Sequence, residues 1–286
     1  MRHWSAFTLI CTVQRMESVV GAGIVVTGGG SGIGAALSRR FAAEGARVVI
    51  NDVNGDSAQA VAASCDTSNG GSAVAVAADA ASEEGVAALI TAARAALGEI
   101  DIYCANAGIA RRGGPEASEA DWADSWNVNV MAHVRAARFL LGRWLERGSG
   151  HLICTVSAAG LLSTPGSAPY AATKHAALAF AEWLSLTHRH RGLTVQAICP
   201  MGVRTGMFPG GDGRSEKLLG PEAIMPEQVA DVVMDAIADG RFLILPHPQV
   251  AETYAGRAAN PDRWLKGMSK LEQWLEEDDP AWSPSH

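Results

Sequence analysis

The sequence has few cysteines, few aromatic residues and no long apolar run. Its five cysteines form no CxxC pair and no cluster with histidine, so neither a disulfide framework nor a zinc site is indicated. Cys104, Cys154 and Cys199 lie in strand-like apolar runs, where a free cysteine is a small core hydrophobe. No segment approaches the about 20 apolar residues that a membrane helix needs. We therefore expect no metal, no membrane contact and a cytoplasmic protein.

Positive charge is also scarce. The formal net charge is −7, which argues against broad binding to nucleic acid or anionic membranes. The start, MRHWSAFTLICTV, faintly resembles a signal peptide, but no small-residue cleavage site follows it. We interpret residues 1–15 as a non-essential N-terminal extension. His188 and His190 are flanked by arginines and are interpreted as a solvated helix end rather than as metal ligands.

A regular alternation of strand-like and helix-like segments fills most of the chain. Seven short β-branched runs, from GIVVTG to RFLILPH, are separated by stretches of helical length. This alternation predicts βαβ units and a parallel sheet that is covered on both faces. We expect an α/β fold with a single doubly wound Rossmann domain and seven strands over residues 16–250. Five expected helices are Gly32–Glu44, Ser82–Leu97, Glu119–Arg147, Ala168–Arg189 and Pro226–Ala238.

Two segments depart from this alternation. Residues 203–225 are rich in glycine and follow the end of a strand, where such sheets bind ligands. We interpret them as a lid, with a plain surface loop as the alternative. Residues 251–286 are a helical tail, and the pattern after Pro246 predicts one amphipathic helix that packs against the body or a second subunit. Its apolar stripe consists of Trp264, Leu265, Met268, Leu271 and Trp274.

The first strand runs into the first helix through the sequence VVTGGGSGIGAAL. Glycine at Gly28, Gly32 and Gly34 permits a tight turn and lets the backbone approach a pyrophosphate. The following helix offers unpaired N–H groups and a favourable dipole. Ser31 and Ile33 belong to the same predicted dinucleotide site.

Two aspartates follow the second and third strands. Asp52 ends the second strand, where a carboxylate accepts hydrogen bonds from ribose hydroxyls and repels a 2′-phosphate. No arginine or lysine occupies the glycine loop, so the sequence favours NAD over NADP. A solvated aspartate in a turn is the alternative. Asp79 ends the third strand in the same way and, with Ala80, can meet the adenine edge.

The fourth strand ends in the sequence ANAG. Asn106 can bridge backbone groups of adjacent strands, while Ala107 and Gly108 leave room for the cofactor. A simple strand-end turn would look similar, so this motif adds support only together with the others.

Tyr170 and Lys174, in YAATK, lie one helical turn apart and share a face. An unperturbed tyrosine titrates near about 10, and a neighbouring positive charge lowers that pKa. Ser157, in TVSAAG, can hold a substrate oxygen beside the phenol. Together the three residues can move a proton on or off a carbonyl or alcohol oxygen. The tyrosine–lysine pair alone is a weak signal, because this spacing occurs often by chance.

Taken in order, these motifs resemble the short-chain dehydrogenase/reductase family over residues 20–247. The family's active-site tetrad matches Asn129, Ser157, Tyr170 and Lys174. Departures from its usual motifs are Ala105 before Asn106, Val156 before Ser157, and Met201 where glycine usually follows the proline.

The resemblance implies hydride transfer between NAD and a secondary alcohol or ketone. Tyr170 would be the general acid/base, Ser157 would polarise the substrate oxygen, and Asn129 would hold a water in a proton relay. Lys174 would hold the nicotinamide ribose and, with the charge of the cofactor, lower the pKa of Tyr170. The family pattern also places three residues at the nicotinamide end: Pro200, Val203 and Thr205.

Alternatives within the same fold are an NADP-dependent ketoacyl-type reductase and a non-catalytic, dinucleotide-sensing regulator. Leu161, Leu162, Met207 and Phe208 suggest an apolar substrate wall. The alanine-rich helices expected over 119–147 and 168–189 resemble those that pair in family oligomers, so we expect a homotetramer or homodimer.

Overall fold

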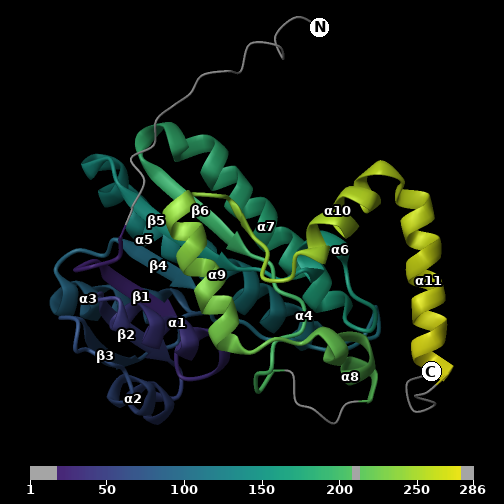
Figure 1. Ribbon diagram of the computed structural model, residues 1–286, viewed down its shortest axis with the longest axis horizontal. Helices are drawn as coiled ribbons and strands as arrows, with labels where there is room; N and C mark the ends of the chain where they lie inside the picture. Colours follow the sequence, from purple (N-terminus) through teal and green to yellow (C-terminus); the bar gives the residue numbers. More distant parts are fainter. Residues whose placement is uncertain (1–17, 208–212, 278–286) are drawn as a thin grey trace, which may run out of the picture.

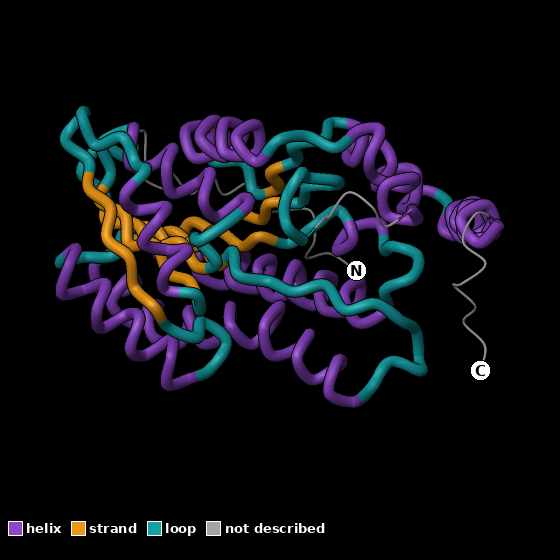
Figure 2. Tube along the Cα trace, turned by 90° about the horizontal axis from the view of Figure 1, so that it is seen from below, coloured by secondary structure: helices purple, strands orange, loops and turns teal. Residues whose placement is uncertain are grey.

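The computed structural model describes residues 18–207 and 213–277. The expected N-terminal extension lies outside the described residues, as do residues 208–212 of the expected lid and residues 278–286 of the tail. Seen from below in Figure 2, the strands form one layer between two layers of helices. This arrangement confirms the predicted α/β class.

All seven expected strands are present and all neighbouring pairs are parallel, in the order β3-β2-β1-β4-β5-β6-β7. The order reverses between β1 and β4. In this type of sheet the ligand crevice lies outside the carboxyl ends of the strands at that reversal. The strands are β1 (Gly23–Thr27), β2 (Arg47–Asp52), β3 (Ser72–Ala77), β4 (Ile102–Ala105), β5 (Gly150–Thr155), β6 (Leu193–Ile198) and β7 (Leu243–Ile244).

Helices cover both faces of the sheet, and each face has its own apolar core. Val25 on β1 packs into the core formed with α3, α5 and α7, while its neighbours Ile24 and Val26 pack into the core formed with α1, α2 and α9. Burial on both sides explains why the strands read as continuous apolar runs. The helices are α1 (Gly32–Ala43), α2 (Gly55–Ala63), α3 (Glu83–Leu97), α4 (Glu119–Trp126), α5 (Ala132–Arg147), α7 (Ala168–His188) and α9 (Pro226–Asp239).

The helix expected over 119–147 is interrupted. A π-helical turn, η1 (Asn127–Met131), separates α4 from α5. Turns of this kind insert one residue into a helix and occur frequently at functional sites. Here the turn carries Asn129, which the sequence had selected as a site residue.

The tail is two helices, so the prediction of a single amphipathic helix was wrong. Helix α10 (Gln249–Ala259) ends before Asn260, whose φ of −150° is not helical, and α11 begins at Pro261 and runs to Glu277. Proline restricts the residue before it and cannot donate a backbone hydrogen bond, so the chain turns there. Figure 1 shows α11 at the right-hand edge, beside α8 (Gly213–Leu219) of the expected lid.

Three short elements complete the described chain: α6 (Ala159–Leu162) and the 3-10 turns η2 (Arg189–Arg191) and η3 (Gly220–Glu222). Within residues 18–207 and 213–277, no helix combines the length and apolarity that crossing a bilayer requires.

Candidate active site

Asn106 ties the carboxyl ends of β1, β4 and β5 together. Its amide nitrogen donates to the Thr27 carbonyl oxygen at 2.9 Å, and its amide oxygen accepts from the Thr155 hydroxyl at 2.9 Å. The Thr27 hydroxyl in turn accepts from the backbone N–H groups of Asn106 and Ala107, each at 3.0 Å. The predicted bridging by Asn106 is present, and the two threonines that complete it were not foreseen.

The glycine loop is a cradle that side chains would fill. A Cβ atom on Gly34 would lie 2.2 Å from the Gly28 carbonyl oxygen, and one on Gly28 would lie 2.9 Å from the Ala107 Cα. Gly28 also has a φ of +61°, which side chains disfavour. The N-terminus of α1 begins at Gly32 and follows directly. Backbone N–H groups at such a helix start, with no side chain in front of them, fit a pyrophosphate.

Asp52 lies at the end of β2 and faces the same loop. Its carboxylate accepts hydrogen bonds from the N–H groups of Gly30 and Asn54, both at 3.0 Å. Asp79 does not end a strand as expected, because β3 stops at Ala77. The Asp79 side chain instead caps a turn by accepting from the Ala81 N–H at 2.9 Å. Ala80, in the same turn, is buried.

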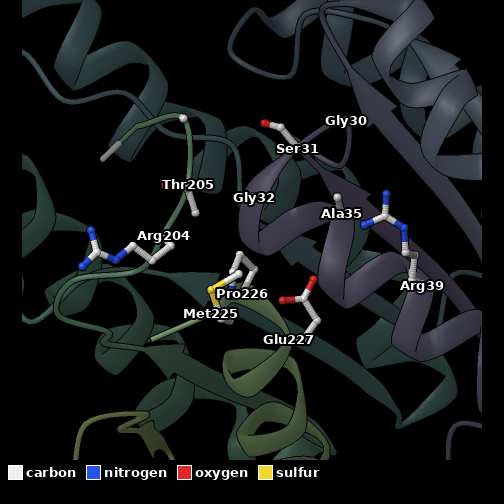
Figure 3. Close-up of a pocket in the computed structure, with 11 residues that line it drawn as sticks. Gly30, Ser31, Gly32, Ala35, Arg39, Arg204, Thr205, Met225, Pro226 and Glu227 are labelled. Carbon is white, nitrogen blue, oxygen red and sulfur yellow. The ribbon is translucent and has the colours of Figure 1, made fainter. Parts of the chain in front are cut away.

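A cavity of about 590 Å³ opens beside the glycine loop. Figure 3 shows Thr205 next to Gly32 in the lining of this cavity, with Arg39 on one side and Arg204 on the other. Arg39 was not selected from the sequence. It lies on α1 rather than in the loop, and its Nε donates to the Ser64 hydroxyl at 2.9 Å.

Helix α7 carries both Tyr170 and Lys174, and it begins with Pro169 in its first turn. Proline is favoured there because the first N–H groups of a helix have no intrahelical partner. The Lys174 ammonium lies 5.6 Å from the centre of the Tyr170 ring and donates to the Thr155 carbonyl oxygen at 2.9 Å. Ser157 follows β5, and its hydroxyl is close enough to the Tyr170 phenol to lower the pKa of that group. The structure therefore brings the three predicted residues together.

Burial dominates the electrostatics of these groups. It raises the pKa of Tyr170, and the Ser157 hydroxyl opposes part of that effect. It also lowers the pKa of Lys174 to about 8. Without the charge of a cofactor, burial thus raises the Tyr170 pKa beside Lys174 and does not lower it. Removal of both groups from water favours their neutral forms.

Asn129 is fully buried beneath the site. Its amide oxygen accepts from the Ile109 N–H at 2.9 Å, and its amide nitrogen donates to the Ile109 carbonyl and the Thr173 hydroxyl. A Cβ on Gly108 would lie 3.2 Å from the Asn129 oxygen and 3.4 Å from the Lys174 nitrogen. Gly108 therefore lies beside both the Asn129 amide and the Lys174 ammonium group.

The segment after β6 spans the site. The Pro200 carbonyl oxygen accepts from the Ala158 N–H at 2.8 Å and from the Ser157 hydroxyl at 3.4 Å. Further along, Val203 is buried and pairs with Ile224. Pro200, Val203 and Thr205, the three residues expected at the nicotinamide end, thus lie on one continuous strip from Ser157 to the glycine loop.

Leu161 and Leu162 of α6, expected in an apolar substrate wall, are buried in the hydrophobic core, whereas Met207 is half-exposed. Phe208, expected in the same wall, lies outside the described residues. Arg257 of α10 contacts the Leu161 carbonyl and His175.

Helix α11 holds the lid helix α8. Glu272 pairs with Arg214, which is buried, and the Lys217 ammonium lies 3.5 Å above the centre of the Trp274 ring. The lid and the tail, which the sequence treats as separate segments, are therefore in direct contact.

His133 and His247 are two further buried histidines near the site that the sequence did not single out. Burial lowers the pKa of His133 to about 3, with the positive charge of Lys174 as the second cause. The only sequence signal for either residue is a histidine in an otherwise apolar stretch.

The doubly wound sheet, the glycine cradle and the buried tyrosine–lysine pair together define a dinucleotide-dependent oxidoreductase. The family model for short chain dehydrogenases matches residues 22–211. The chain therefore belongs to the short-chain dehydrogenase family.

Known members of the family act on alcohols and ketones. The chain is 41% identical over 229 residues to a 1-deoxy-11-beta-hydroxypentalenate dehydrogenase from Streptomyces exfoliatus, covering 77% of this chain and 81% of the relative. It is 33% identical to the meso-2,3-butanediol dehydrogenase of Serratia marcescens, with 77% and 89% covered. A short-chain dehydrogenase from Burkholderia phymatum in complex with NAD superposes with a TM-score of 0.78 at 28% identity, with 86% and 96% covered. The chain accordingly catalyses dinucleotide-dependent hydride transfer on hydroxyl or ketone substrates.

Proposed function

We propose that this protein is an NAD-dependent dehydrogenase of secondary alcohols in which Tyr170 is the general acid/base. The observation that carries the proposal is the convergence of Tyr170, Ser157 and Lys174 at the carboxyl ends of β5 and β6, next to the glycine cradle. The nicotinamide of the dinucleotide accepts or donates the hydride. The protein residues position the substrate and handle its proton.

Each residue has a distinct task in this proposal. The Ser157 hydroxyl holds the substrate oxygen, and Tyr170 takes its proton during oxidation or returns it during reduction. Lys174 holds the nicotinamide ribose and supplies positive charge beside the phenol. Asn129 fixes the backbone at Ile109 and borders the Lys174 nitrogen at Gly108, which is the place for a water that passes the proton onward.

Asp52 supports NAD as the preferred dinucleotide. Its carboxylate faces the loop through the N–H of Gly30, so a 2′-phosphate placed there meets a like charge. Arg39 lines the cavity beside the glycine loop and is the residue that would favour NADP. The Asp52→Ala variant tests the proposal: its ratio of NAD to NADP activity is expected to fall, and an unchanged ratio contradicts the ribose contact.

An apolar secondary alcohol is the proposed substrate class. The support for this class is that the apolar residues Leu161 and Leu162 follow shortly after Ser157 and that a relative is named a hydroxypentalenate dehydrogenase. We also propose a homotetramer or homodimer in the cytoplasm, supported by exposed Trp183 and Leu186 on α7 and by free cysteines among the described residues.

The Tyr170→Phe variant tests the proton role directly. It removes one oxygen atom and keeps the ring, so NADH binding, measured by fluorescence, is expected to remain near wild type. Turnover of a panel of cyclic and linear secondary alcohols, followed by NADH absorbance, is expected to fall at least about 10²-fold, within the range that a general acid/base contributes. Full turnover in this variant would refute the assignment, and NADH binding without turnover in the wild type would favour a dinucleotide sensor.

A further inference from the structure

His247 lies in the connection from β7 to α10 and is 2% exposed. Its ring is hydrogen-bonded on both sides to backbone groups that are far away in the sequence. Nδ1 accepts from the Met201 N–H at 3.2 Å, and Nε2 lies 3.1 Å from the Glu222 carbonyl oxygen. His247 therefore contacts Met201, just before the lid segment, and Glu222, near the end of that segment.

These two partners fix the tautomer of the ring. A backbone N–H can only donate and a carbonyl can only accept, so Nδ1 must be bare and Nε2 must carry the hydrogen. Burial lowers the pKa of His247, although the backbone groups of Glu222 and Gly202 and the Glu222 carboxylate oppose the effect. The ring is thus neutral at pH 7, as both hydrogen bonds require.

Met201 lies in the strip that connects the two halves of the site. The residue before it, Pro200, accepts from the Ser157 hydroxyl and the Ala158 N–H. Further along, Thr205 fills the space in front of Gly32, where a Cβ would come within 3.0 Å of its methyl carbon. A shift of this strip at Met201 would therefore move contacts at the catalytic serine and at the glycine loop together.

Ile224, near the carboxyl-terminal end of the lid, pairs with the same strip. The Ile224 N–H donates to the Gly202 carbonyl at 3.1 Å, and the Arg204 N–H donates to the Ile224 carbonyl at 2.9 Å. His247 braces this short ladder from outside through Glu222 and Met201. The Met201 N–H takes no part in this ladder, because it donates to the His247 imidazole.

We propose that His247 is a positioning residue for the dinucleotide site, and that its hydrogen bond to the Met201 N–H sets the place of the strip from Pro200 to Thr205. The proposal rests on the proposed function of the site. It also gives a reason for the departure at Met201. A residue with a side chain is accommodated there because its backbone is held from outside by His247 while the side chain packs against the apolar core.

Two conservative variants separate the two hydrogen bonds of the ring. In His247→Asn the amide oxygen can occupy the place of Nδ1 and accept from Met201. In His247→Gln the amide nitrogen can occupy the place of Nε2 and donate to Glu222 but leaves Met201 without its acceptor. His247→Ala loses both contacts.

The Kd for NADH, measured by fluorescence titration, is the primary measurement, and kcat with cyclohexanol and NAD is the second. His247→Asn is expected to stay within about threefold of wild type, whereas the Gln and Ala variants bind NADH about tenfold more weakly and lose up to about 10²-fold in kcat, as misplacement of a positioned group can cost. Equal values for Asn and Gln, or wild-type values for all three, would overturn the proposal. If the alanine variant does not fold, the Asn–Gln pair alone decides.

His151→Asn is the matched control. His151 is also a buried histidine with a side-chain partner, Gln196, but it lies at the opposite, amino-terminal end of β5. This variant is expected to lower the melting temperature and to leave the Kd for NADH unchanged, so a general loss of stability cannot imitate the His247 result. Failure of the wild-type chain to bind NADH would contradict the proposed function itself. Normal wild-type binding with no difference between the Asn and Gln variants would contradict only the role of His247.

Discussion

Replacing Lys174 by methionine is expected to abolish turnover while leaving the protein at least as stable as wild type at pH 7. Lys174 is 3% exposed, and its ammonium group donates to the Thr155 carbonyl. Methionine has a similar length, is unbranched and carries no charge. The substitution therefore removes a buried charge and one hydrogen bond but keeps most of the packing.

The size of the effect follows from the pKa of Lys174, which burial lowers from 10.5 to about 8. At about 1.4 kcal/mol per pH unit, keeping this amine charged costs the fold about 3 kcal/mol at pH 7. The Thr155 carbonyl loses its donor in the variant, which costs about 1–3 kcal/mol. The net expectation is an unfolding free energy between that of wild type and about 2 kcal/mol above it.

The pH dependence of the unfolding free energy gives an independent check on the sign of this effect. Because the pKa of Lys174 is lower in the folded than in the unfolded chain, the unfolded chain binds more protons between pH 8 and about 10.5. The cost of keeping Lys174 charged is therefore full below pH 8 and disappears as the pH rises to about 10.5. Urea unfolding at pH 7 and pH 10 should show the wild type gaining on the Lys174→Met variant at the higher pH. A wild type that is more stable than the variant by over about 1 kcal/mol at pH 7 would refute this reasoning.

Three further predictions concern the glycine cradle and the tail. Gly34→Ala should lose about 1–3 kcal/mol and NADH binding, because its Cβ would overlap the Gly28 carbonyl oxygen. Gly256→Ala, in the interior of α10 with nothing within 4 Å, should instead gain up to about 1 kcal/mol, and thermal melts compare the two. Glu272→Gln removes the ionic partner of Arg214 and should speed hydrogen exchange in both α8 and α11. Unchanged exchange would mean that this ion pair does not hold the lid.

Local patterns predicted the fold because each one has a local cause. Apolar runs of strand length and a glycine loop at the first strand–helix junction are sufficient to indicate a doubly wound sheet. Helix boundaries also agree closely: α7 begins at Ala168 as expected and ends at His188, one residue early. The error at β3 has a local reason as well, because the Asp79 side chain bonds to the backbone of its own turn and takes the chain out of the sheet.

The sequence does contain a signal for the break between α10 and α11 in the tail. The apolar stripe from Trp264 to Trp274 belongs to α11 alone, and Pro261 marks the start of that helix. A stripe at helical spacing says which residues share a face, whereas a proline says where a helix can begin. The apolar periodicity led to the prediction of one helix, whereas Pro261 correctly marks the boundary between two helices.

Much of the site could not be predicted, because its partners are distant in the sequence. The Asn129 side chain, in the π-turn, hydrogen-bonds to Ile109 and Thr173. The His247 ring hydrogen-bonds to Met201 and Glu222. In both cases a buried polar side chain pairs with groups that only the folded sheet brings within reach. Motif spacing selects the residues that do chemistry, but it carries no information about the residues that hold them.

The same limit explains the direction of the tyrosine pKa. Helical spacing correctly places Tyr170 and Lys174 together, yet burial acts on both and drives each toward its neutral form. A half-charged amine at pH 8 is a weak counter-charge for a phenolate. The proposed proton transfer therefore needs a second positive charge in the crevice. A bound oxidised nicotinamide would add one in the oxidation direction, in which Tyr170 acts as the base. Coupling of this kind would make proton abstraction by Tyr170 depend on the bound dinucleotide, because burial alone keeps the phenol protonated.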